Sequence, residues 1–183
     1  MSSTTPIPPQ PDASRLTAFA GHPAVVGIVP KQPELVMLTA VAWSHAVGDA
    51  KLVFAYADPR RYVVEEHADG SVEHTALDPD DADGIWRDRC ARMEAHLHRV
   101  VDPTGVPWEF QYLAGRQDRA LTHLARAVDA GVIIVGTRAP GLRHGARGLL
   151  AGSTEVLLSH HQHRPVLVVP LTVVDWKTQL SWG

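Results

Sequence analysis

The sequence predicts an open, five-stranded parallel α/β sheet with helices on both faces. Short runs such as AVVGIV (24–29) and VIIVG (132–136) are apolar throughout and rich in β-branched residues, which is typical of strands buried on both faces. These runs alternate with longer segments in which apolar residues recur at helical spacing. Strands that alternate with helices in this way imply parallel βαβ units, and hence a sheet covered on both sides.

The first βαβ unit covers residues 24–57. After the strand at 24–29, Pro33 suits the first turn of a helix and Gly48 suits its end. The helical spacing predicts an inward-facing stripe made of Leu35, Leu38, Ala42 and His45 or Ala46. The apolar run AKLVFAYA at 50–57 predicts the second strand.

The next segment interrupts this alternation. Two short polar strands are expected around Asp69-Gly70, a common hairpin turn, so we interpret residues 58–82 as an inserted loop or hairpin. The acidic residues Asp78, Asp80, Asp81 and Asp83 lack the spacing, glycine and glutamate of an EF-hand calcium loop. They are therefore interpreted as a solvated start of the following helix.

The second half of the chain resumes the alternation. Helices are predicted at residues 85–102 and 116–131, and strands at 107–115, 132–136 and 165–169. The inward-facing stripe of the first of these helices comprises Trp86, Cys90, Met93, Leu97 and Val100. A further helix is expected between the last two strands. In such sheets, ligands bind beyond the carboxyl ends of the strands, where the strand order reverses.

Composition narrows the classes of function. A chain of 183 residues fits one domain, and a net charge of −3 with a pI near 6.4 argues against a nucleic-acid binder. The single cysteine, Cys90, is compatible with a reducing, cytoplasmic location. No apolar run has the roughly 18 residues of a membrane span. Residues 1–20 lack the features of a signal peptide and are expected to form a disordered leader.

A loop rich in glycine and arginine follows the strand at 132–136. Its glycines are Gly136, Gly141, Gly145, Gly148 and Gly152, and the last precedes Ser153-Thr154 at the start of a helix. Free N–H groups at that start, aided by Arg138, Arg143 and Arg147, would receive a phosphate. The alternative is a flexible loop with solvated arginines and an ordinary helix cap. The loop is not a P-loop, and no dinucleotide-binding fingerprint follows the first strand.

With these elements in this order, and with GLLAGSTEVLLSHHQHRPVLVVP at its end, the stretch 24–170 resembles the universal stress protein family. The resemblance implies a domain at 21–170, a C-terminal tail at 171–183 and a homodimer formed through the strand at 165–169. It also implies ATP or AMP binding, as in many members, with Mg²⁺ only as the companion of a nucleotide.

The family's nucleotide motif is a Gly, two residues, a Gly, nine residues, and then Gly-Ser or Gly-Thr. Gly136 matches the first glycine and Gly152-Ser153 match the last pair. Ala139 stands where the second glycine is expected, Gly141 could take its place, and the loop is three residues longer than the pattern.

The end of the first strand also departs from the family. Nucleotide-binding members have a stretch such as VGVDGS, whereas this chain has VGIVPK, so that Val29 replaces the Asp and Lys31 the Ser. Val29 has no side-chain acceptor. The predicted nucleotide-binding residues are Val29, Pro30, Gly136, Arg138, Gly141, Arg143, Gly152, Ser153 and Thr154. The alternative function is a dimerisation or interaction module that binds no nucleotide.

The sequence does not favour an enzyme beyond weak ATP hydrolysis. Ser153 has no base at a recognisable spacing, and no Gly-x-Ser-x-Gly elbow is present. A nucleotidyl transferase would need a His-x-Gly-His or Ser-Gly-Gly-x-Asp motif, and neither occurs. His160, His161 and His163 lack the spacing of a metal site. Trp176 and Trp182 in the tail are expected to pack on the domain or on a partner.

Overall fold

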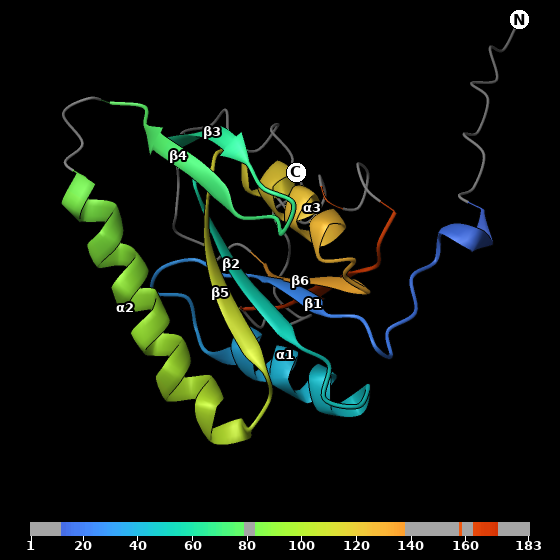
Figure 1. Ribbon diagram of the computed structural model, residues 1–183. Coiled ribbons are helices and arrows are strands. Elements are labelled where there is room, and N and C mark those ends of the chain that lie inside the picture. The colour runs from blue at the N-terminus through green and yellow to red at the C-terminus, as the bar shows by residue number, and fades with distance from the viewer. Residues whose placement is uncertain (1–11, 79–82, 138–157, 159–162, 172–183) are drawn as a thin grey trace, which may run out of the picture.

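A parallel sheet of five strands forms the centre of the molecule in the computed structural model, which describes residues 12–78, 83–137, 158 and 163–171 (Figure 1). Across the sheet the strands are β5 (Trp108–Ala114), β2 (Leu52–Asp58), β1 (Ala24–Gly27), β6 (Val132–Gly136) and β7 (Val166–Val169). Every neighbouring pair is parallel. The predicted fold class is therefore confirmed.

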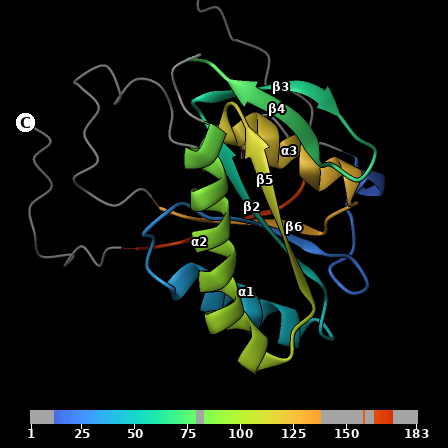
Figure 2. The same ribbon diagram turned by 60° about the vertical axis from the view of Figure 1, so that its left-hand side comes forward.

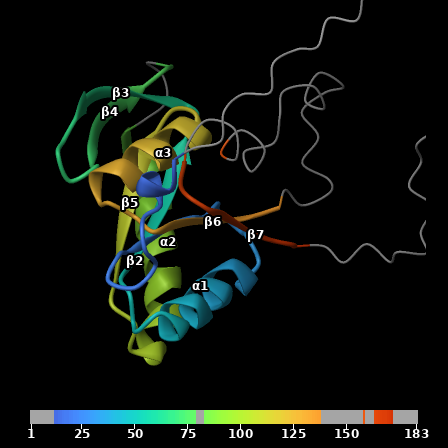
Figure 3. The same ribbon diagram turned by 90° about the vertical axis from the view of Figure 1, so that its right-hand side faces the viewer.

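Helices cover both faces of this sheet. α1 (Leu35–Ala46) and α2 (Asp83–Val101) lie on one face, and α3 (Gln117–Ala127) lies on the other (Figures 2 and 3). Each face has its own apolar core, because alternate strand residues point to opposite sides. Phe54 and Ile134 belong to the core beneath α1 and α2, whereas Ile133 and Leu121 belong to the core beneath α3. Short 3-10 helices lie at Ala13–Arg15 and Asp102–Thr104.

Helix α1 buries a different face from the one that the sequence predicted. Its buried residues are Val36, Met37, Ala40, Val41 and Ser44. Leu35 and Leu38, which were expected to face inward, are each 48% exposed, and Ala42, His45 and Ala46 are exposed as well. The predicted stripe was wrong because α1 has apolar residues on every side. In such a helix the spacing alone does not select the buried face.

An antiparallel hairpin connects β2 to α2. It consists of β3 (Arg61–Glu66) and β4 (Val72–Ala76). Gly70 in its turn has a φ of +85°, which favours glycine, and it packs directly on α3. A Cβ at Gly70 would lie 2.6 Å from Leu124 Cδ1 and 3.0 Å from the Ala127 methyl group. The turn of the hairpin is therefore anchored on the α3 side of the sheet.

Several expectations fall outside the described residues. The helix predicted between β6 and β7 is one of them, apart from the fully buried Leu158. So are the leader up to residue 11 and the tail from residue 172. Within the described ranges, every helix is too short or too polar to cross a membrane.

Candidate functional site

The strand order reverses between β1 and β6. The chain passes from β1 through α1 to β2 on one side, whereas β6 is followed by β7 on the other. The two strands are paired in register, with Gly27 opposite Val135, so their carboxyl ends lie side by side. Val29 and Pro30 follow β1 after one residue, Ile28, and Gly136 ends β6. This is the position at which open α/β sheets bind their ligands.

A cavity of about 820 Å³ opens beside the end of β1. This volume is within the range of small-molecule sites. Its walls come from the β1–α1 loop, from α1 and from α2 on the same face of the sheet. The lining residues are Ile28, Val29, Pro30, Lys31, Gln32, Pro33, Glu34, Met37, Arg89, Arg92, Met93 and His96. The cavity thus joins the predicted residues Val29 and Pro30 to a helix that the sequence analysis did not include in the site.

The cavity combines an apolar wall with positive charge. Buried Met37 on α1 and buried Met93 on α2 both line the cavity and belong to the same apolar core. The cations Lys31 and Arg92 have no ion-pair partner within the described part of the chain, whereas His96 Nε2 lies 3.8 Å from Glu34 Oε1. Two unpaired cations beside an apolar surface suit a ligand that has both a flat apolar part and an anionic part.

Gln32 links the ends of β1 and β6. Its Oε1 accepts a hydrogen bond from the Val29 N–H at 2.8 Å, and its own N–H donates to the Val29 carbonyl at 3.2 Å. Its Nε2 lies 2.8 Å from the point that a Cβ on Gly136 would occupy. Val36 Cγ2 and Leu171 Cδ1 lie 2.9 and 2.8 Å from the same point. Gly136 is therefore needed here for side-chain packing.

Arg89 is held in the cavity wall by a buried carboxylate at the end of β2. The Asp58 side chain is only 2% exposed and forms an ion pair with Arg89. Asp58 Oδ2 also accepts a hydrogen bond from the Tyr112 hydroxyl at 2.7 Å, and Oδ1 accepts one from the Arg60 N–H at 3.0 Å. Burial, and after it the hydrogen bond to Asp58, raises the pKa of Tyr112 well above its ordinary value. This network connects the α2 wall of the cavity to the end of β2, where the hairpin begins, and to β5.

The structure brings together only part of the predicted site. Val29 and Pro30 line the cavity, and Gly136 lies next to it through Gln32. The remaining predicted residues, Arg138, Gly141, Arg143, Gly152, Ser153 and Thr154, lie outside the described residues.

Sequence reasoning missed Gln32 and the α2 side of the cavity. Arg89, Arg92 and His96 recur at helical spacing on α2, next to the buried Met93. Polar residues that border an apolar stripe on a helix can indicate the side of the helix that lines a cavity. The sequence therefore contained a usable indication for α2. Gln32 had no such indication, because its position depends on the turn at the end of β1.

Comparisons with known proteins give the same fold. The crystal structure of a universal stress protein in complex with cAMP is 23% identical, with a TM-score of 0.53, covering 84% of this chain and 99% of that one. The universal stress protein UspA from Lactobacillus plantarum is 13% identical, with a TM-score of 0.57 and coverages of 82% and 98%. A universal stress protein from Archaeoglobus fulgidus in complex with dAMP is 16% identical, with a TM-score of 0.54 and coverages of 81% and 97%.

Sequence comparison identifies the family. No curated protein matches this chain at a significant level. The family model described as "Universal stress protein family", however, matches residues 24–170, which include all five strands of the sheet. The chain therefore belongs to the universal stress protein family.

Proposed function

We propose that this protein is a stress-response regulatory module that binds an adenine nucleotide, ATP or AMP, in the cavity at the end of β1. The observation that supports the proposal is the cavity itself, where an apolar wall meets two cations that have no ion-pair partner among the described residues, at the reversal of the strand order. Two structures with this fold were solved with cAMP and with dAMP. An adenine nucleotide has the two parts that the cavity would accommodate, a flat base and a phosphate.

Each part of the nucleotide has a proposed partner. The base packs against Met37 and Met93, and the phosphate is attracted by Lys31 and Arg92. The loop after β6 adds the N–H groups and arginines that the sequence predicts for phosphate binding. Mg²⁺ is expected only with ATP, as the companion of its phosphates. Val29 offers no side-chain acceptor, so affinity depends on the apolar wall and the cations more than on a carboxylate.

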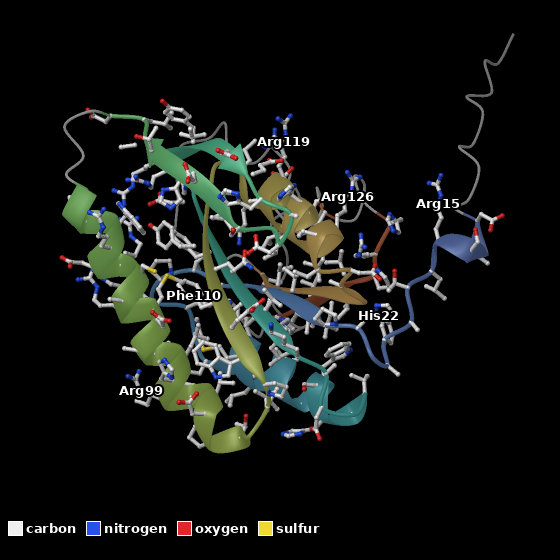
Figure 4. The ribbon with its side chains drawn as sticks, in the orientation of Figure 1. Arg15, His22, Arg99, Phe110, Arg119 and Arg126 are labelled. Carbon is white, nitrogen blue, oxygen red and sulfur yellow. The ribbon has the colours of Figure 1, made fainter. Side chains whose placement is uncertain are left out.

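The proposal is tested by calorimetric titration of the full chain with AMP and ATP, after the supernatant of the denatured protein has been analysed for bound nucleotide. Arg92→Glu should weaken binding at least 10-fold, since it replaces a phosphate-attracting charge with a repelling one. Arg119→Glu is the matched control. Arg119 is also an exposed helix arginine without an ion-pair partner among the described residues, but it projects from α3 (Figure 4). Met93→Trp should fill the cavity and abolish binding.

Two results would contradict the proposal. The first is that the purified protein contains no nucleotide and does not bind AMP or ATP at millimolar concentration. The protein would then be a dimerisation or interaction module that binds no nucleotide. Equal losses in Arg92→Glu and Arg119→Glu would show that the effect of charge is not local to this cavity.

The sheet edge supports a second function that needs no nucleotide. Among the described strands, β7 pairs with β6 on one side only, and Leu167 and Val168 on it are 36% and 38% exposed. We propose that two chains pair through β7 about a two-fold axis, between Pro165 and Pro170, which donate no N–H. Light scattering should give twice the 19.9 kDa chain mass, and Val168→Pro should lower it. A monodisperse 19.9 kDa species would contradict the dimer.

A further inference from the structure

Helix α1 has a second apolar face that nothing in the described structure covers. Leu35 and Leu38 are about half exposed, and the exposed Ala42 and Ala46 continue the same side of the helix. This side is opposite to the one that packs on the sheet. Figure 3 shows α1 at the lower edge of the molecule, with its outer side free of other described elements. A helix that is apolar all round is normally buried, so we expect another segment or molecule to pack on this outer face.

The last described residue of this part of the chain lies beside the first turn of α1, on the inner side of the helix. Leu171 packs against the core beneath α1 and α2. Its Cδ1 and the Cγ2 of Val36, in the first turn of α1, lie 2.8 and 2.9 Å from the same point beside Gly136. The described chain therefore ends beside the first turn of α1, the turn that also contains the half-exposed Leu35.

The residues that follow Leu171 are apolar enough and long enough to pack along this outer face of α1. They are TVVDWKTQLSWG (172–183), in which Val174, Trp176, Leu180 and Trp182 alternate with polar residues. An alternation of period two presents the apolar side chains on one side of an extended segment. Twelve extended residues span up to about 40 Å, whereas the 12 residues of α1 span about 18 Å. The tail can thus follow α1 over its whole length.

We propose that residues 172–183 dock on the outer face of α1, the face formed by Leu35, Leu38, Ala42 and Ala46, with Trp176 and Trp182 as the main contacts. The alternative occupant is a second copy of the chain. An intramolecular cover on α1 leaves the edge of β7 open, so it is compatible with pairing through that strand. It also goes beyond nucleotide binding, because neither face of the contact belongs to the cavity.

A double-mutant cycle in the full chain tests this contact. Leu38→Lys places a charge in the proposed contact, and the combined Trp176→Ser and Trp182→Ser variant removes the aromatic side chains. Each should lower the thermal midpoint by about 3 °C, and the two together should lower it little more than one of them does. Leu77→Lys, at another exposed leucine on the hairpin side of the molecule, is the control and should combine additively with the tail variant.

Fluorescence quenching gives an independent readout. In a Trp43→Phe, Trp86→Phe, Trp108→Phe background the tail tryptophans report alone. They should be shielded from acrylamide, and Leu38→Lys should raise their quenching about twofold while Leu77→Lys leaves it unchanged. Additive midpoints, or tail tryptophans as accessible as free indole, would overturn the proposal. A fall in molecular mass with Leu38→Lys at unchanged quenching would overturn it in favour of a second copy.

Discussion

Replacing Asp58 with alanine should destabilise this fold strongly, although the residue is a single carboxylate at the end of a strand. The Asp58 side chain is nearly inaccessible to water and accepts hydrogen bonds from the Tyr112 hydroxyl and the Arg60 N–H. Its ion-pair partner Arg89 is itself mostly buried. Asp58→Ala would leave that guanidinium without its counter-charge and the tyrosine hydroxyl without its acceptor.

The magnitude follows from this burial. Removing one partner of a buried ion pair costs about 4 kcal/mol, because the remaining charge can neither be paired nor be fully hydrated. A domain of this size loses about 3 °C per kcal/mol, so we expect the thermal midpoint to fall by about 12 °C. Arg60 provides the matched control. Its side chain is 55% exposed and lies 3.6 Å from the same carboxylate, so Arg60→Ala should cost less than about 1 kcal/mol.

Urea denaturation followed by tryptophan fluorescence and by circular dichroism measures both variants. The double variant Asp58→Ala, Arg89→Met should be more stable than Asp58→Ala alone, since it removes the uncompensated charge. The reasoning fails if Asp58→Ala and Arg60→Ala differ by less than about 1 kcal/mol. It also fails if removing Arg89 from the Asp58→Ala background brings no recovery.

Three further changes test other parts of the structure. Gly136→Ala should cost about 1–3 kcal/mol in urea denaturation because its Cβ would lie under 3 Å from three side chains, whereas Gly84→Ala, with open space around it, should not destabilise. Gly70→Ala should speed hydrogen exchange in the hairpin, because φ is positive there and Leu124 blocks the Cβ. Burial raises the pKa of Tyr56 and Tyr112 above 10.0. The stability from keeping them neutral is therefore complete below pH 10 and lost as the pH rises further, and ultraviolet titration should show both ionising late.

The sequence predicts the sheet well because its strands are buried on both faces. VIIVG was predicted as residues 132–136, and β6 has those bounds. The first strand ends at Gly27, two residues earlier than expected, because the chain leaves the sheet before the turn between Val29 and Gln32. The buried face of α1 could not be predicted, since Leu35 and Leu38 are as apolar as the residues that pack inward.

The candidate site was predictable only where it follows the ends of strands. Val29, Pro30 and Gly136 have positions fixed by β1 and β6, and parallel strands bring their carboxyl ends to one edge. Arg92 comes from a helix whose packing against the β1–α1 loop is a tertiary contact without a local pattern. The position of Gln32 depends on a side-chain hydrogen bond within a turn, which no periodicity indicates.

The central place of β1 has a consequence for how the protein is made. One neighbour of β1 is β2, close by in sequence, but the other is β6, roughly a hundred residues further along the chain. While the ribosome synthesises α2, β5 and α3, one edge of β1 has unpaired N–H and C=O groups, and the strand carries only apolar side chains. We therefore expect the nascent chain to depend on chaperones until β6 emerges and pairs with β1 at the middle of the sheet.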